Sequence, residues 1–439
     1  MQWFLDLSHG LQAATILGVF ATVCLAAVAH LRSGALAFLA MAAPLAAALP
    51  AILQPNGDSF AVVLVLAATF SCALLMRSEE LADARQRAEC VALQLLGAAG
   101  ACVLVCANDW LSLLIGFESM SLAVAVLVGI GRGPRSLEVA FRFFVLSAVA
   151  AATLVYGIAL FAYATGSFAI GAPALAEPGM QAMATAAVVM AALGLAFELA
   201  IVPSHFGTLS VCFAAPLSCL TFAMTVSKVA AAIAMARLCV LHPQLQPIMV
   251  GLAIVTIVWS TFGGLAQTHL RGMLAYSAIG HGGFLALAAG CGQLASGTVA
   301  YYALVYAASI VLVLGALSGG SGDLPIAALA RQPMGRMRRA ALVLGLLSLA
   351  GVPPSPGFLA KLAVLRHSWE AAGVTCTVVA ALGGVFGALF YLRPVPELLS
   401  DRSTSGTVTP TAVRVAIAMG ALVSMLCMLA PQFAVRLAN

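Results

Sequence analysis

Charged residues are scarce in this 439-residue chain. Asp, Glu, Lys and Arg together make up 8% of it, and hydrophobic residues make up 63%. A soluble domain usually has about 25% charged residues, so this composition excludes an ordinary soluble enzyme and predicts a polytopic membrane protein. The net charge of +5 comes from arginines scattered singly or in small groups. Membrane orientation explains that charge, and nothing predicts a nucleic-acid partner.

Lysine is almost missing. Of the twenty basic residues only Lys228 and Lys361 are lysines, and both lie inside long apolar stretches instead of in loops. An ammonium group in hydrocarbon is costly and by default marks an ion or proton path. A buried lysine can lose its proton, whereas an arginine cannot. The two lysines are therefore the first candidates for function.

Metal-binding and redox patterns are also missing. The eleven cysteines include no CxxC pair, and most lie in apolar runs, as Cys24, Cys72 and Cys239 do. Such positions favour plain apolar packing over metal or iron–sulfur ligation. We therefore expect no metal site, no bound cofactor and no redox centre in this chain.

Long apolar segments fill most of the sequence. Each is about 20 residues long, enough to cross a bilayer as a helix. They lie near 11–31, 33–54, 59–76, 88–107, 110–131, 139–164, 183–203, 215–239, 248–266, 270–291, 297–318, 340–364, 374–393 and 412–430. We predict an all-α polytopic membrane protein with about 14 transmembrane helices. No basic region precedes the first segment, so we expect no cleavable signal peptide.

Basic residues are concentrated in alternate loops. The odd-numbered loops hold thirteen of the twenty: Arg32, Arg77, Arg85, Arg87, Arg132, Arg135, Arg271, Arg331, Arg336, Arg338, Arg339, Arg393 and Arg402. The even-numbered loops hold only Arg237 and Arg366. By the positive-inside rule, the odd loops are cytoplasmic and both termini lie on the other side of a bacterial-type inner (cell) membrane.

Two spans are interrupted by proline in a similar way. The seventh reads LAIVPSHFG over 199–207, and the twelfth reads LAGVPPSPGF over 349–358. Proline removes a helical hydrogen bond, so each span should be a discontinuous helix. The breaks are five spans apart, and an odd offset inverts the second copy. This predicts two inverted five-helix repeats (spans 4–8 and 9–13) and four parts: 1–87, 88–241, 242–394 and 395–439. A proline kink used only for packing is the alternative.

Ionisable residues occur inside several predicted spans. Five of them form the predicted proton pathway: Glu118, Glu198, Lys228, His281 and Lys361. Each could change protonation if its surroundings moved its pKa toward neutrality. The alternative for any one is a satisfied internal pair or a side chain that snorkels to the interface. His205 at the first break and Arg142 near the start of the sixth span are possible accessory residues, although Arg142 could simply reach the interface.

Several segments carry a family resemblance. They are 107–118 (ANDWLSLLIGFE), 136–147 (SLEVAFRFFVLS), 197–205 (FELAIVPSH), 227–228 (SK), 271–281 (RGMLAYSAIGH) and 351–361 (GVPPSPGFLAK). In them the chain resembles the antiporter-like membrane subunits of respiratory complex I, NADH:quinone oxidoreductase, and most closely the N-type. A lysine at position 361 is similar to the N and L types, and the short C-terminus argues against L.

The resemblance implies a proton-translocating, membrane-arm subunit coupled to quinone reduction elsewhere. It makes Glu118 the glutamate of the fifth span, Lys228 the central lysine, His281 the connecting histidine and Lys361 the group near the exit. The chain would be a translocase subunit without a redox active site. NADH, FMN, iron–sulfur clusters and quinone are expected in partner subunits of the membrane complex, and quinone would act on this chain only indirectly.

The chain also departs from the family pattern. The family pairs its fifth-span glutamate with a lysine in the seventh span, where this chain has Glu198. Two carboxylates in a dry site cannot both stay charged, so either one holds a proton or Arg142 neutralises them. The stretch after His205 also lacks the family's tryptophan and acidic residues. Two alternatives therefore stay open: a subunit of a related membrane-bound hydrogenase or multisubunit cation/proton antiporter, and a non-pumping structural subunit.

Overall fold

The regular structure of the chain is helical. The computed structural model describes residues 8–26, 33–53, 59–76, 84–130, 134–172, 178–318, 323–400 and 409–431. Within these ranges every regular element is a helix, and the only extended pairings are two isolated bridges, Asp109 with Ala169 and His269 with Pro325. The predicted all-α class is confirmed. Arg32, Arg77, Arg132 and Arg402, which contribute to the predicted orientation, lie outside the described residues.

Helices occupy every predicted apolar segment. The N-terminal helices are α2 (His9–Ala26), α3 (Ser33–Leu53) and α4 (Ser59–Met76). The next group is α5 (Ala84–Val105), α6 (Trp110–Gly129), α7 (Pro134–Thr165), α8 (Pro178–Ala196), α9 (Phe206–Ala214) and α10 (Leu217–Leu241). The third group is α11 (Gln246–Leu265), α12 (Leu270–Gly290), α13 (Ser296–Leu317), α14 (Arg336–Ala350), α15 (Pro356–Ala371) and α16 (Gly373–Leu392). The last two are α17 (Pro394–Leu399) and α18 (Thr411–Leu429).

Both proline clusters interrupt a helix. The seventh predicted span ends as a helix at Ala196, and the chain resumes helical structure only at Phe206. The twelfth consists of two helices: the first ends at Ala350, and the second begins at Pro356. Each break contains a cis X–Pro bond, at Pro203 and at Pro354, and one residue with positive φ, Ala200 at 60° and Gly351 at 75°. The predicted discontinuous helices are therefore present in both spans.

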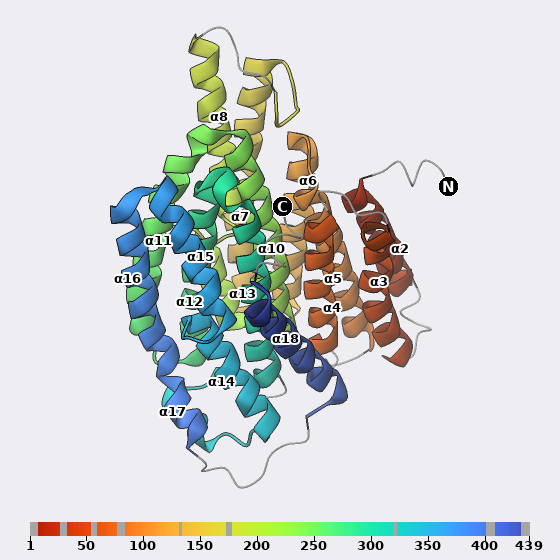
Figure 1. Cartoon of the computed structure of the whole chain (residues 1–439). Coiled ribbons are helices and arrows are strands. Elements are labelled where there is room, and N and C mark those ends of the chain that lie inside the picture. The colour runs from red at the N-terminus through yellow and green to blue at the C-terminus, as the bar shows by residue number, and fades with distance from the viewer. Residues whose placement is uncertain are drawn as a thin grey trace.

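A long apolar bundle results. Ten helices in the described residues are long and apolar enough to cross a membrane, and α2, α3 and α4 are shorter apolar helices. Figure 1 shows most of the long helices running along one common direction, with α2 to α5 on one side of the bundle and α16 on the other. The chain is therefore a multi-pass membrane protein.

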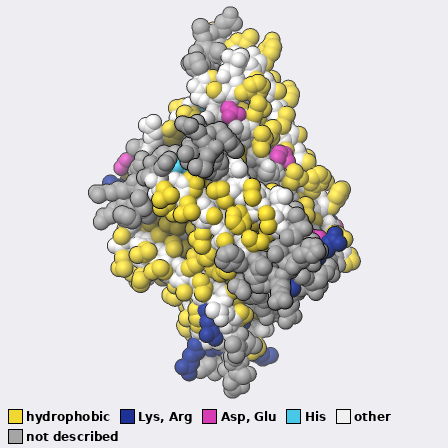
Figure 2. Space-filling view, turned by 90° about the vertical axis from the view of Figure 1, so that its right-hand side faces the viewer, with side chains coloured by type: hydrophobic (Ala, Val, Ile, Leu, Met, Phe, Trp, Pro, Cys, Tyr) yellow, Lys and Arg dark blue, Asp and Glu magenta, His cyan; other side chains and the backbone are white. Residues whose placement is uncertain are grey.

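The outer helices present apolar side chains to the surroundings. On α7 and α16, for example, Phe141, Val149, Val385 and Phe386 are exposed. Figure 2 shows such apolar side chains across the middle of one face, with basic side chains gathered toward its lower end. In a membrane protein this apolar surface faces lipid, which explains why so many large hydrophobic residues lie outside the core.

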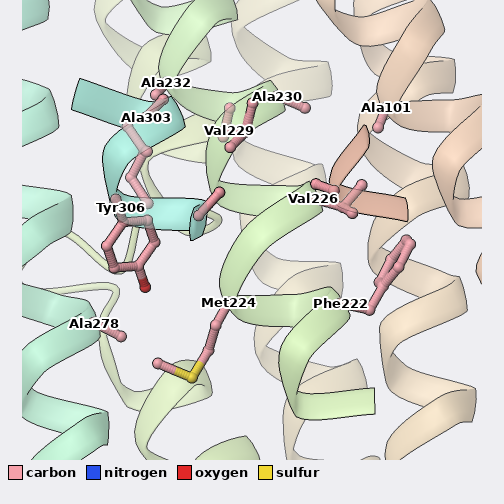
Figure 3. Close-up of a cluster of buried hydrophobic side chains, with 14 of the residues drawn as sticks. Ala101, Phe222, Met224, Val226, Val229, Ala230, Ala232, Ala278, Ala303 and Tyr306 are labelled. Atoms are coloured by element: carbon pink, nitrogen blue, oxygen red, sulfur yellow. The ribbon is translucent and has the colours of Figure 1, made fainter. Parts of the chain in front are cut away.

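The centre of the bundle is built around α10. This helix packs against α5, α12 and α13, and nearly all of its side chains are buried. Figure 3 shows Phe222 of α10 pointing toward α5, whereas Met224 of α10 lies on the side of α12 and α13 with Ala278 and Tyr306. Small residues such as Ala230 and Ala232 let these helices approach closely. Residues placed on α10 and α12 are therefore shielded from lipid.

Candidate functional site

Lys228 lies at the middle of α10 in the core of the bundle. Its side chain is 1% exposed, and its Nζ donates to the carbonyl oxygen of Glu198 at 3.4 Å. Glu198 lies two residues beyond the last helical residue of α8. Carbonyl groups at the C-terminal end of a helix carry partial negative charge and lack intrahelical donors. The break in the seventh span thus provides an acceptor for the buried ammonium group.

The carboxyl group of Glu198 shares this site. Its side chain is 5% exposed, and Oε1 is buried without a hydrogen bond. Lys228, Glu118 and the hydroxyls of Ser121 and Ser227 are its electrostatic neighbours. Glu198 and Ser227 also border a cavity of about 20 Å³, which is room for roughly one water molecule. The structure therefore brings together three predicted residues, Glu118, Glu198 and Lys228.

His281 lies between the two halves of the predicted pathway. It is buried on α12, and its Nδ1 is 2.8 Å from the hydroxyl of Tyr302. Its Nε2 is buried without a hydrogen bond, with the carbonyl of Leu349 as a near neighbour. Lys228 and Lys361 are both electrostatic neighbours of this ring. Helix α12, which carries this ring, packs against α10 with Lys228 and against α15 with Lys361.

Lys361 lies on α15, directly after the second break. Its Nζ donates to the carbonyl oxygens of Leu349 and Ala350, both at 2.9 Å, and lies 5.5 Å from the centre of the Phe284 ring. Ala350 is the last residue of α14. A second cavity of about 20 Å³ is bordered by Lys361, His281 and Tyr391. Each lysine thus sits at the C-terminal end of the first half of a broken helix, and each half of the pathway contains a cavity of about one water molecule.

The two possible accessory residues have other contacts. His205 is buried at the start of α9, where its Nδ1 is 3.2 Å from the carbonyl of Pro203 and its ring packs edge-on against Trp259. Arg142 is exposed and forms an ion pair with Glu138 at 2.6 Å, one turn earlier on α7. In the described part of the chain, this ion pair favours an Arg142 side chain that reaches the membrane interface over one that neutralises Glu118 and Glu198.

Four arginines bind carbonyl groups at the ends of other helices. Arg237 donates to Val105 at the end of α5, and Arg393 donates to Leu265 at the end of α11. Arg271 binds Cys212 and Ala215 at the end of α9, and Arg338 binds Ala316 and Ser318 at the end of α13. A guanidinium complements the negative end of a helix. Arginine therefore acts here at the ends of the bundle, and lysine at its centre.

The cysteines pack among the helices, and one of them, Cys212, borders the cavity beside Glu198. All eleven are free thiols, and ten are buried among the helices. Within the described residues, no three His, Cys, Asp or Glu side chains are grouped so that they could hold a metal ion. The packing role predicted for the cysteines agrees with their positions.

Sequence reasoning missed the hydroxyl groups of the site. The rings of Tyr302, Tyr306 and Tyr391 lie 5.7, 4.9 and 6.3 Å from the His281 ring, in tilted or edge-on orientations, and Tyr391 donates to Ser277 at 2.6 Å. These residues come from α13 and α16, so only the tertiary packing brings them to α12. The available signal was polar aromatic residues inside apolar spans, because a buried tyrosine hydroxyl requires a partner.

Comparisons with known proteins point to one family. Residues 107–387 match the family described as NADH:quinone oxidoreductase/Mrp antiporter, transmembrane, a range that contains all five residues of the predicted pathway. The chain belongs to this family.

Two relatives with one and the same name align with most of the chain. It is 36% identical over 310 residues to NADH-quinone oxidoreductase subunit N of Cereibacter sphaeroides, which covers 69% of this chain and 68% of the relative. It is 31% identical over 435 residues to the subunit N of Parvibaculum lavamentivorans, covering 92% and 88%. This family membership confirms the predicted resemblance.

Solved structures share the fold. A chain of respiratory complex I from Thermus thermophilus superimposes with a TM-score of 0.85 at 26% identity, covering 97% of this chain and 99% of that one. A chain of the Mrp complex from Dietzia sp. superimposes with a TM-score of 0.81 at 18% identity, covering 97% and 96%. At that lower identity the second likeness concerns the fold alone.

Proposed function

We propose that the chain is a proton-translocating membrane-arm subunit of a complex I-type NADH:quinone oxidoreductase. One observation carries the proposal: each buried lysine is held by carbonyl groups at the broken end of a helix, and His281 borders the same cavity as Lys361. Ionisable groups inside a membrane mark ion paths by default. The relatives named NADH-quinone oxidoreductase subunit N indicate the kind of complex to which the chain would belong.

The proposed path runs from Glu118 and Glu198 to Lys228, then to His281 and Lys361. At Lys228 the ammonium is stabilised by the Glu198 carbonyl, and the neutral amine that remains after loss of a proton keeps only a weaker, uncharged hydrogen bond to it. The imidazole of His281 can accept a proton on its unbonded Nε2, while Nδ1 stays bonded to Tyr302. A water molecule in each small cavity would bridge gaps between these groups.

The proposal assigns redox chemistry to other subunits. NADH, FMN, iron–sulfur clusters and quinone would bind in partner subunits of the complex, and this chain would hold none of them. Its own contribution is to move protons between buried groups as those partners change charge. Quinone reduction would then influence the row only through neighbouring membrane-arm subunits.

We also propose the finer architecture of fourteen spans with two inverted five-helix repeats. Matching local features support it. The bridges at Asp109 and His269 both precede the second helix of a repeat. Arg237 and Arg393 both tie the last helix of a repeat to the end of its first. With the basic loops cytoplasmic, both termini lie on the opposite side.

Replacing Lys228 by Met in the native membrane complex tests the function. The ratio of protons pumped to electrons transferred should fall, because a thioether cannot carry a proton, while the complex still assembles. Arg85→Met is a matched control, because Arg85 is exposed and pairs with Glu89 on the surface. An unchanged ratio in Lys228→Met would instead support a non-pumping structural subunit.

The partner subunits test the kind of complex. The family description covers both NADH:quinone oxidoreductases and Mrp antiporters. Purification of the native assembly through a tag on this chain should recover flavin- and iron–sulfur-containing subunits that oxidise NADH. Recovery of hydrogenase or cation/proton antiporter subunits in their place would overturn the complex I assignment while leaving the proton path intact.

A further inference from the structure

A threonine hydroxyl on α11 forms a hydrogen bond with the backbone of the break between α8 and α9. Thr256 is fully buried at the middle of α11. Its Oγ1 accepts a hydrogen bond from the backbone N–H of Val202 at 3.0 Å and donates to the carbonyl of Leu252 at 2.6 Å. Val202 lies in the unwound segment between α8 and α9, four residues after Glu198.

The backbone N–H groups around Val202 form few hydrogen bonds to other parts of the protein. The N–H groups of Glu198, Ala200 and Ile201 bond locally, to residues at the end of α8 or just beyond it. Val202 bonds instead to a side chain from a distant helix, and Pro203 has no N–H to donate. A buried N–H without a partner is unfavourable, so the Thr256 hydroxyl determines where residue 202 can lie.

The neighbouring helix holds the same segment from another side. A Cβ on Gly282 of α12 would lie 1.9 Å from the carbonyl oxygen of Leu199. The backbone of α12 therefore runs directly against the residue that follows Glu198. Helices α11 and α12 together confine residues 199–202, and α12 also carries His281.

The same helix reaches the second cavity. One turn beyond Thr256, Ser260 and Thr261 border the cavity shared by His281 and Lys361. Thr261 also donates to the carbonyl of Gly383 on α16. A shift of α11 would thus change contacts at the first break and at the second cavity together.

We infer that Thr256 is a positioning residue for Lys228: it fixes the unwound segment so that the Glu198 carbonyl faces the ammonium group, and it ties that geometry to α11. The effect on proton transfer rests on the proposed function. The effect on the position and exposure of the segment does not, so the two can be measured separately.

The experiment compares Thr256→Val, Thr256→Ser and Thr69→Val in the purified complex. Thr69 is a buried threonine of α4 that donates to the carbonyl of Val65, one turn earlier, in the same way as Thr256 does to Leu252. Thr69→Val therefore removes a comparable hydroxyl without touching the break. Amide hydrogen exchange of residues 197–205 and the proton-to-electron ratio are measured for each variant.

Thr256→Val should speed exchange in residues 197–205 by at least about tenfold, as expected when a backbone N–H loses its partner, and should lower the proton-to-electron ratio. Thr256→Ser should restore both, because it retains the hydroxyl. Thr69→Val should change neither. Unchanged exchange in Thr256→Val would overturn the positioning role. A second result would also overturn the inference: Thr256→Val speeds exchange but leaves the proton-to-electron ratio unchanged, although Lys228→Met lowers that ratio. The position of the segment would then not affect proton transfer at Lys228.

Discussion

Lys228 and Lys361 occupy chemically equivalent places: each donates to a carbonyl group at the C-terminal end of the first half of a broken helix. The acceptors are Glu198 beyond α8, and Leu349 and Ala350 at the end of α14. Such carbonyls favour a cation, yet they carry no full negative charge that would trap it. A helix break therefore lets a buried lysine hold a proton without requiring a permanent ion pair.

Replacement of Glu198 should lower the stability and the proton-to-electron ratio of the complex more than replacement of a surface glutamate. Glu198→Gln replaces the buried carboxyl near Lys228 by an amide, which cannot take up or release a proton. We expect reduced thermal stability of the complex and a lower proton-to-electron ratio. Glu89→Gln is the control, since the exposed pair with Arg85 is worth at most about 1 kcal/mol. Equal effects of the two changes would argue against a special role for Glu198.

A glutamate-to-lysine change tests the departure from the family pattern. Glu198 has Glu118 as an electrostatic neighbour, so Glu198→Lys would create an ion pair of the kind that the resemblance implies. We expect this variant to assemble and to keep pumping. Measurement of assembly by native gel and of pumping in vesicles checks the expectation. Failure of the variant to assemble would count against the closeness of the two glutamates.

Tyr302 should tune the central histidine. Tyr302→Phe removes the hydroxyl that lies 2.8 Å from His281 Nδ1, and the ring would lose the group that orients it. We expect NADH oxidation to be preserved and proton pumping to slow, by about 100-fold where the hydroxyl takes part in proton transfer.

The adjacent residue provides a close control. Tyr301 is equally buried, but its hydroxyl donates to the carbonyl of Cys427 on α18. Tyr301→Phe should cost about 1 kcal/mol of stability and leave the pumping ratio unchanged. The same loss of pumping in both variants would mean that it reflects packing, not the histidine.

Asp109 should stabilise the start of α6 in a pH-dependent way. Its carboxylate caps the helix by accepting from the Ser112 backbone N–H at 2.8 Å and from the Ser112 hydroxyl at 2.7 Å. Partial burial raises the pKa of Asp109, but the Ser112 hydrogen bonds outweigh burial and leave the pKa below its usual value. Asp109→Ala should cost about 1 kcal/mol at neutral pH.

The sign of the pH dependence follows from that lowered pKa. A group with a lowered pKa in the folded state contributes its stability above the ordinary Asp pKa of about 3.9 and loses it as pH falls through the folded value. The difference in thermal stability between the native chain and Asp109→Ala should therefore be constant from pH 8 to about pH 5 and shrink below about pH 4. A difference that grows on acidification would contradict this role.

Several features of the fold and the site could be predicted from the sequence. The helix breaks follow from proline clusters in apolar runs, because proline cannot continue a helical hydrogen-bond pattern. The pathway residues stand out because ionisable groups are rare in such runs. In the twelfth span, the predicted break separates α14 from α15, and the two helices extend from Arg336 to Ala371, beyond the predicted limits of 340–364.

Contacts between distant helices could not be predicted in this way. Thr256 and Tyr302 look like ordinary residues of apolar helices, and only the packing of α11 against the first break and of α13 against α12 gives them partners. The ion pair of Arg142 with Glu138 is a spacing of four residues within one helix, so it could have been read from the sequence. The local pair was predictable, whereas the distant ones depend on the tertiary structure.

The proton-to-electron ratio of the complex with Lys228→Arg or Lys361→Arg tests most directly whether these two lysines carry protons. Arginine keeps a positive charge at the helix end but does not release its proton in a protein, so assembly should persist while transfer stops. We expect normal NADH oxidation with a lowered ratio for either variant. A native ratio in both variants would contradict the claim that these lysines carry protons.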